Sequence, residues 1–300
     1  MSKIRIVTDS SAQFLNPSII RQYGIVVIPM EIHMGGRVYR EGVDIDADHY
    51  FKKLNDPAVT ELPSLVAPDP NKIAEVYGKL CRDGWKILSI HVSRAFHPMW
   101  HHCKQATQLL LGRCDIEVVD SQTTSVGLAV MVEEAAKMID QDVPLPDIIR
   151  ALRSLQSHIY TMFYVETLEY LRRGGLLSES QTVLGSMLGI KPFLTIEEGD
   201  LMAVEKVRTR TQAIDKLVEF ASEFEVMDKV AVLYNGHTPP EVLRSLSDRL
   251  QDEVGHRHYP ALVYQPSLAC FLGPDAVGIF IYESESADFG QLGEEFGEID

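Results

Sequence analysis

The sequence predicts an α/β fold in which a mainly parallel sheet forms an N-terminal domain and a second α/β domain follows. Short β-branched runs alternate with amphipathic stretches, and this succession is typical of parallel sheets covered by helices. The chain has 300 residues, about twice the length of a typical domain, with 45% hydrophobic and 24% charged residues. This usage is that of a folded globular protein and excludes a disordered or low-complexity chain.

Seven runs rich in β-branched and aromatic residues are predicted as strands. Amphipathic patterns between them predict helices. The first of these opens with Pro70, which a first helical turn tolerates, and the last two have apolar residues every three to four positions. The expected strands are residues 4–8, 25–32, 87–92, 116–119, 159–165, 229–234 and 277–282, and the expected helices are residues 70–81, 124–139, 166–173, 209–224 and 239–250.

Two prolines mark the expected domain boundary. Pro144 and Pro146 interrupt the helical pattern, and a short polar helix then leads to the strand at residue 159. We therefore expect domains at residues 1–157 and 158–282. The remaining residues, 283–300, contain seven Asp or Glu and no Lys or Arg, which predicts a frayed acidic tail.

The charge of the chain argues against an anionic partner. The 28 Lys and Arg and 43 Asp and Glu give a net charge of −15 without a basic cluster, so nucleic acid and membrane surfaces are disfavoured. No apolar run approaches the length of a membrane span, and the N-terminus lacks a secretory-signal pattern. Because the cysteines show no CxxC or framework spacing, we expect a soluble, cytoplasmic protein with reduced thiols at Cys81, Cys103, Cys114 and Cys270.

Polar residues follow two of the expected strands. Asp9, Ser10 and Ser11 come directly after the first strand, and Ser93 and Arg94 follow the third. Ligands bind at the carboxyl ends of strands in open α/β sheets, and a cation beside a hydroxyl suits a carboxylate or phosphate. The same residues also fit a structural role as turn formers and helix caps, so both interpretations stay open.

A histidine cluster raises the question of a metal site. His97 and His101 would share one helical face, but no carboxylate or CxxC pair completes a ligand set, and Pro98 disturbs the helix between them. We therefore expect no metal. His237 stands alone after a strand, and no GxSxG, Walker A, GxGxxG or HExxH pattern supports a common enzyme class. The whole cluster comprises His91, His97, His101, His102 and Cys103.

An ordered set of short motifs resembles the DegV family. Each motif alone is weak, but the set falls in the family's order and extends to about Tyr282. The motifs are IVTDSSA at residues 6–12, VDS at 119–121, TLEYLRRGG at 167–175, LGIKP at 188–192, KVR at 206–208 and GP at 273–274.

The resemblance implies a two-domain α/β protein that buries one long-chain fatty acid. Some family members are the lipid-presenting subunit of a bacterial fatty-acid kinase, whose separate ATP-binding subunit resembles dihydroxyacetone kinases. On this basis the chain is not itself an enzyme and needs no cofactor, because catalysis belongs to the partner. In the family, the acyl carboxylate lies against a Thr-Ser-Gln-Pro-Ser loop, a Ser-Ser pair after a strand and a histidine of a His-x-Gly-Pro-Gly segment.

Carried over to this sequence, the polar clamp of the family is incomplete. Ser93 matches the first serine of the pair, but Arg94 replaces the second. Leu65 and Val66 fall where the loop has hydroxyls, and Phe271 stands where the histidine is expected. A carboxylate buried among these apolar side chains would lack donors, which raises its pKa or expels it.

These departures leave three outcomes open for the head group. Arg94 supplies a replacement ion pair, or the ligand is a neutral lipid such as an ester or alcohol, or lipid binding has been lost. A second register of the loop keeps hydroxyls at Thr60 and Ser64 but needs an insertion. We expect the head group near Ser93, Arg94 and residues 9–11, and an apolar tunnel walled in part by residues 184–190, which end at Ile190.

The competing hypothesis is an enzyme that acts on a small phosphorylated or acylated metabolite. Ser10 or Ser93 would be the nucleophile or phosphate anchor, with Asp9 in support. Such an enzyme needs a base within hydrogen-bond reach of the serine. The candidate bases are His91, His97 and His237.

Overall fold

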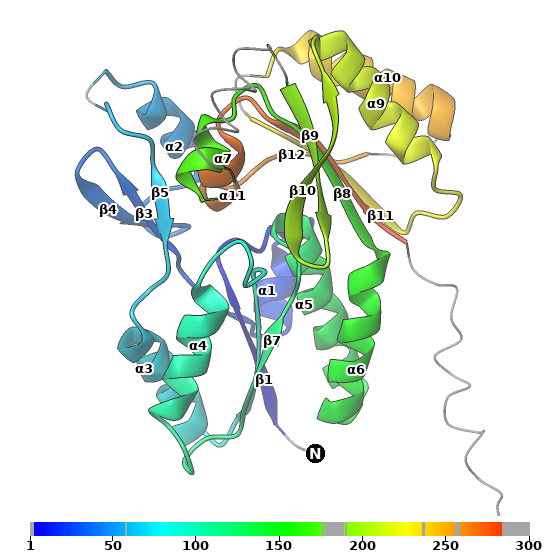
Figure 1. The fold of residues 1–300 in the computed structure, drawn as a ribbon. Coiled ribbons are helices and arrows are strands. Elements are labelled where there is room, and N and C mark those ends of the chain that lie inside the picture. The colour runs from blue at the N-terminus through cyan, green and yellow to red at the C-terminus, as the bar shows by residue number, and fades with distance from the viewer. Residues whose placement is uncertain are drawn as a thin grey trace, which may run out of the picture.

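Strands and helices alternate through the first part of the chain, as the hydrophobic pattern predicts (Figure 1). The computed structural model describes residues 3–57, 59–175, 177, 189, 191–235, 238–255 and 259–283. The elements of the first part are β1 (Ile4–Asp9), α1 (Ser18–Gln22), β2 (Val26–Ile28), β3 (Glu31–Met34), β4 (Arg37–Arg40), α2 (Ala47–Leu54), β5 (Ser64–Val66), α3 (Pro70–Arg82), β6 (Lys86–His91), α4 (Met99–Gln108), β7 (Ile116–Asp120), α5 (Ser125–Asp140) and α6 (Leu145–Leu155).

The second part begins with a single 3-10 turn, η1 (Gln156–His158). Its other elements are β8 (Ile159–Tyr164), α7 (Glu169–Arg173), β9 (Lys191–Glu197), β10 (Asp200–Val207), α9 (Arg210–Ser222), β11 (Lys229–Tyr234), α10 (Pro240–Val254), β12 (Ala261–Val263), α11 (Pro266–Leu272) and β13 (Val277–Tyr282). No described helix is long and apolar enough to cross a membrane.

A parallel sheet of order β2-β1-β6-β7 forms the centre of the first part. Its central strands β1 and β6 are almost fully buried, because helices cover both faces of the sheet. Figure 1 shows α3 and α4 on one side and α1 and α5 on the other. The chain leaves β1 toward β2 on one side and later returns as β6 on the other. The carboxyl ends of β1 and β6 therefore flank a switch in strand order, the place where open α/β sheets bind ligands. The predicted parallel sheet is confirmed.

One expected strand, residues 25–32, is instead two strands in two different sheets. β2 ends at Ile28 and pairs with β1, whereas β3 begins at Glu31 and forms an antiparallel sheet of order β4-β3-β5. Pro29 lies between them, and a proline has no N–H with which to continue a ladder. The prediction of one continuous strand was therefore wrong, although both halves are extended.

A sheet of order β10-β9-β8-β13-β11-β12 dominates the second part and is antiparallel except between β11 and β12. Successive residues of β11 point to opposite faces. Ala231 and Leu233 join the hydrophobic cluster of the parallel sheet, whereas Val230 and Val232 join a second cluster with residues of α9 and α10. The first cluster thus contains residues of both large sheets, and the domain boundary at residue 157 stays a prediction.

Two of the four cysteines form a disulfide. Cys81 in α3 is bonded to Cys114, which precedes β7, with the Cα atoms 5.6 Å apart. Cys103 and Cys270 are free and buried. The expectation that all thiols are reduced was wrong for this pair. The two cysteines are 33 residues apart, a separation that matches none of the short cysteine motifs by which a sequence predicts a disulfide. The packing of α3 beside the chain before β7 brings the two sulfurs together.

Candidate head-group site at the ends of β1 and β6

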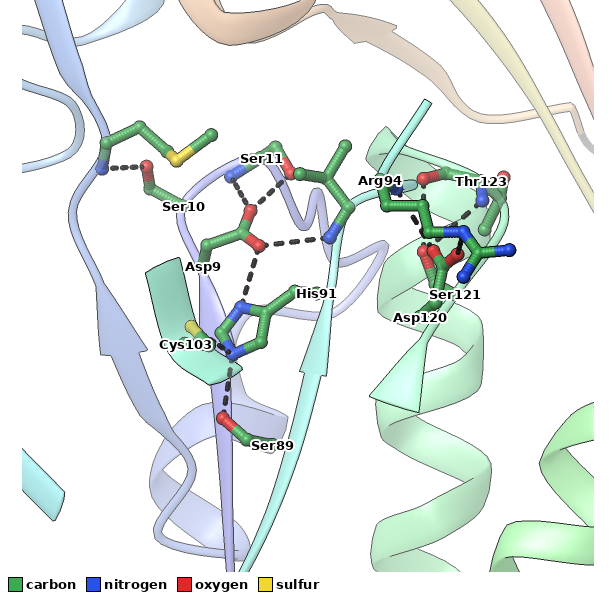
Figure 2. Close-up of polar contacts among 12 residues, drawn as sticks. Asp9, Ser10, Ser11, Ser89, His91, Arg94, Cys103, Asp120, Ser121 and Thr123 are labelled. Carbon is green, nitrogen blue, oxygen red and sulfur yellow. Dashed lines mark hydrogen bonds and ion pairs between the residues drawn. The ribbon is translucent and has the colours of Figure 1, made fainter. Parts of the chain in front are cut away.

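Figure 2 shows Asp9 and Ser11 beside His91, whereas Arg94 lies apart from them and next to Asp120. Parallel pairing sets Val7 of β1 opposite Ser89 of β6, so the loops that leave these strands start next to each other. Asp9 ends β1, Ser11 lies in the loop after it, and His91 ends β6. The two strand ends are therefore neighbours in the sheet, and a ligand-binding role for the polar residues there stays a prediction.

The Asp9 carboxylate is the centre of a fully buried network. It accepts hydrogen bonds from the Ser11 backbone N (3.1 Å), the Ser11 hydroxyl and the Val92 backbone N (3.1 Å), and it contacts His91 Nδ1 at 3.0 Å. Burial acts to raise the pKa of Asp9, but the hydrogen bonds from His91, Ser11 and Val92 and the His91 charge outweigh it and lower the pKa. Asp9 is thus an ionised residue that ties the loop after β1 to the loop after β6.

His91 extends this network into the sheet. Its Nε2 lies 2.7 Å from Ser89 Oγ and 3.2 Å from Cys103 Sγ, and Ser89 Oγ lies 2.8 Å from the Tyr77 hydroxyl. Burial acts to lower the pKa of His91, but Cys103 and Asp9 raise it to about 10. His91, Cys103 and Asp9 are all 0% exposed, and their contacts hold the two strand ends together. A ligand-binding role for Asp9 stays a prediction.

Ser10 points away from this network and binds a carboxylate that the sequence prediction missed. Its hydroxyl donates to Glu41 Oε2 (2.5 Å) and accepts from the Met30 backbone N (2.9 Å). Glu41 Oε1 accepts from the Ser267 backbone N (2.7 Å) in the first turn of α11. Burial raises the pKa of Glu41 to about 7, with a further contribution from Asp9, although the Ser10 and Ser267 hydrogen bonds lower it. A lone glutamate after an exposed strand gives no sequence signal for such a contact.

Ser93 and Arg94 form separate contacts. The Ser93 hydroxyl donates to the Gly199 carbonyl oxygen (2.8 Å), in the turn between β9 and β10, and accepts from the Ala95 backbone N (3.3 Å). The Arg94 guanidinium lies 3.3 Å from the Asp120 carboxylate, and Figure 2 shows the two side by side. The Arg94 side chain is 58% exposed. A head-group role for Arg94 stays a prediction, which requires this side chain to leave Asp120.

A pocket of about 170 Å³ brings together two residues that the resemblance places at the family's polar clamp. Leu65 of β5 and Phe271 of α11 line it, and the rings of Phe96 and Phe271 are 5.9 Å apart, edge to face. His97, from the loop before α4, lines the same pocket. The resemblance places the family's histidine at the position that Phe271 occupies in this chain. The histidine that lines this pocket, His97, comes instead from the loop before α4.

The remaining predicted residues do not extend the pocket. Val66 follows Leu65 in β5 but does not line this pocket. Ile190 and residues 184–188 lie outside the described residues, as does His237. Within the described ranges, no group of three or more His, Cys, Asp or Glu residues is arranged to hold a metal ion. His97 is buried and His101 is exposed, so the two do not present a common ligand face.

The serine-nucleophile hypothesis lacks its base in the part of the chain that the structure describes. Ser10 is bonded to Glu41 and Met30, and Ser93 to Gly199 and Ala95. Neither hydroxyl contacts a histidine there. The geometry therefore gives no support to a serine-based enzyme.

A comparison with protein families covers nearly the whole chain: residues 3–284 match the family model described as an uncharacterised protein, DegV family. The chain belongs to the DegV family. A DegV domain-containing protein of Halalkalibacterium halodurans is 29% identical over 286 residues, which is 94% of this chain and 99% of the relative. A second one, of Caldanaerobacter subterraneus, is 28% identical over 94% of this chain and 100% of the relative. The resemblance drawn from the ordered motifs is thus confirmed.

Solved DegV structures share the fold. The chain is similar to a fatty-acid-binding DegV family protein from Thermus thermophilus, with a TM-score of 0.80 and 26% identity over 94% of this chain and 100% of that one. It is also similar to DegV of Bacillus subtilis, described as a fatty acid binding protein, with a TM-score of 0.81 and 25% identity over 95% and 100%. The two-part α/β architecture of this chain is that of DegV proteins.

Proposed function

We propose that this DegV protein binds one long-chain fatty acid or a related lipid and carries out no chemistry of its own. The observation that carries the proposal is the end-to-end match to the fatty-acid-binding Thermus thermophilus protein, which this chain covers completely. The pocket between β5, the loop after β6 and α11 supports it, because Leu65, Phe96 and Phe271 give it an apolar wall opposite polar residues and it lies near the switch in strand order.

The head group is proposed to lie in this pocket and the acyl chain beyond it. A volume of about 170 Å³ is smaller than the roughly 300–1,000 Å³ of small-molecule pockets, so a long acyl chain must extend further. We keep residues 184–190, with Ile190, as the proposed tunnel wall. The apolar residues at the pocket, Leu65 and Phe271, offer no donor to a carboxylate.

The acyl chain can supply most of the binding free energy. Burying about 14 methylenes contributes on the order of 11 kcal/mol before the cost of ordering. Affinity is therefore expected to depend more on chain length than on any one polar contact. A partner then receives the lipid, and we propose a cytoplasmic kinase subunit similar to dihydroxyacetone kinases, in keeping with the family resemblance. No cofactor is required on this chain.

A chain-length series tests the proposal. Each pair of methylenes removed from a saturated fatty acid should lower the affinity of lipid-stripped protein roughly 15-fold, because each contributes about 0.8 kcal/mol. The measurement is the dissociation constant of palmitate, myristate and laurate by titration calorimetry, with one site per chain. Weak binding of many molecules per chain, or an affinity independent of length, contradicts an enclosed lipid site.

A further inference from the structure

The pocket contains a buried histidine with one unpaired nitrogen. His97 is 4% exposed and lines the pocket together with Leu65 and Phe271. Its Nε2 lies 3.4 Å from the Leu65 carbonyl oxygen, whereas Nδ1 is buried and has no hydrogen-bond partner among the residues that the structure describes. A buried polar atom without a partner costs free energy, which a ligand that completes the bond recovers.

The contact with Leu65 decides which kind of bond Nδ1 can form. A carbonyl oxygen only accepts, so Nε2 of His97 carries the proton. Burial lowers the pKa of His97 to about 4, against the raising effects of Asp9 and the Leu65 carbonyl, and the ring is therefore neutral at pH 7. In a neutral imidazole with Nε2 protonated, Nδ1 is a hydrogen-bond acceptor.

We propose that His97 selects a lipid head group that donates a hydroxyl hydrogen bond to Nδ1, either the protonated carboxyl of a fatty acid or the hydroxyl of a fatty alcohol. The inference rests on the proposed function and specifies its head-group chemistry. An ionised carboxylate has no proton to donate, and its charge is unfavourable beside a buried acceptor. The side chains of Leu65 and Phe271 offer no donor to a carboxylate, and the donors that line the pocket beside His97 are the Ser64 hydroxyl and the Arg173 guanidinium.

Charged and titratable groups reach His97 and the pocket from several elements. Asp9 after β1 and His102 of α4 act on His97 through their charges, and Arg173 of α7 and Cys270 of α11 line the pocket. Burial raises the pKa of the Cys270 thiol to about 12, so it stays neutral. Arg173 is exposed, where an ion pair is weak. Arg173 is nevertheless the rival partner for an ionised carboxylate, and the pH dependence of binding separates the two.

Dodecanoate and 1-dodecanol are suitable probes because they share one acyl length. We expect the affinity of lipid-stripped protein for dodecanoate to fall about 100-fold between pH 6 and pH 8, because the protonated fraction falls tenfold per unit above the carboxyl pKa of ~4–5. The affinity for 1-dodecanol should stay constant, which also controls for titration of protein groups such as Glu41. The inference is overturned if the affinity for dodecanoate is equal at both pH values and higher than the affinity for 1-dodecanol. This result would mean that the bound head group is ionised.

Substitutions at His97 give a second readout. His97→Leu removes the acceptor and should weaken 1-dodecanol binding at least tenfold, whereas His97→Gln, whose amide oxygen accepts, should stay within threefold of the native protein. His101→Leu changes an exposed histidine of α4 and should have no effect. A His97→Leu variant that melts like the native protein and binds equally well also overturns the inference.

The two levels of the proposal fail differently. If native protein binds neither probe at either pH, the lipid-binding function itself is wrong. If it binds dodecanoate without pH dependence, lipid binding stands and only the head-group selection by His97 fails. The pH comparison uses native protein, so it decides the matter even if the His97 variants do not fold.

Discussion

Asp9 and His91 form the ion pair that fixes the two loops after β1 and β6. Both side chains are 0% exposed, and the Asp9 carboxylate also accepts backbone hydrogen bonds from each loop. Removing one partner of a buried pair leaves the other charge unpaired in a low-dielectric interior. Single residues here therefore decide the stability of the site.

Substitution of Asp9 should be strongly destabilising. Asp9→Asn is expected to lower the free energy of unfolding by about 3–5 kcal/mol, because the His91 charge stays buried without its partner. Urea denaturation measures the change. Asp115→Asn, which removes an exposed pair with Lys86, is the matched control and should cost less than about 1 kcal/mol. Equal costs for the two variants would contradict the buried-pair account.

The raised pKa of His91 predicts a loss of stability in alkaline solution. Its folded-state pKa of about 10 lies above the unfolded value of ~6.5, so its contribution is complete below pH 6.5 and is lost as the pH rises toward 10. The free energy of unfolding should therefore fall over this range in native protein and fall less in His91→Gln. A variant with the same alkaline slope as native protein would show that His91 is not charged in the folded state.

At the scale of elements, Glu41 connects α11 to the loop after β1. It accepts from the Ser10 hydroxyl and from the Ser267 backbone N, and α11 also carries the pocket residue Phe271. A buried carboxylate in this position is only half ionised near pH 7. Its protonation state therefore affects how firmly α11 is held.

Glu41 should give the molecule a second, separate pH dependence. Its folded-state pKa of about 7 lies above the unfolded value, so stability falls as the pH rises from about 4.5 to 7. Glu41→Gln should remove roughly 2 kcal/mol of the fall between pH 5 and pH 7, because most of the 2.5-unit difference in pKa, at 1.36 kcal/mol per unit, is expressed in this interval. Unfolding measured at pH 5 and pH 7 checks it, and a slope unchanged by the substitution contradicts the raised pKa.

The disulfide joins α3 to the chain before β7. Closing a loop of 33 residues is expected to stabilise the oxidised protein by roughly 3–4 kcal/mol through the unfolded state. Thermal unfolding with and without dithiothreitol measures the effect, and Cys81→Ser should melt like the reduced protein. A thiol-reactive dye counts the free thiols of freshly purified protein that has been unfolded without a reducing agent. A count of four free thiols would mean that the bond does not form.

The elements that the sequence predicted accurately are those with a clear apolar pattern. β1, β6, β8, β11 and β13 lie within a residue or two of their expected ranges because their apolar runs are continuous. β10 was missed because most of its residues are exposed and its apolar residues do not alternate with polar ones, and β5 and β12 because each has only three residues. α7 starts at Glu169 rather than residue 166. Exposed and very short elements are set by neighbouring strands, which a local pattern does not contain.

At the scale of the whole molecule, the sequence predicted which strand ends lie together more reliably than it predicted the contacts of their side chains. The loops after β1 and β6 could be found because they follow recognisable buried strands. Three contacts of the site join segments that are distant in the chain or lack any motif. They are the contacts of Ser10 with Glu41, of Arg94 with Asp120 and of His97 with Leu65. Such contacts depend on tertiary packing, which sequence spacing alone does not specify.

The central claim is that this chain encloses one lipid, and native mass spectrometry of freshly purified protein tests it most directly. Organic extraction and mass analysis then identify the bound species. We predict one lipid per chain, either a fatty acid or a neutral lipid with a free hydroxyl. A mass equal to that of the bare chain, together with no uptake of palmitate by the same sample, would contradict the account.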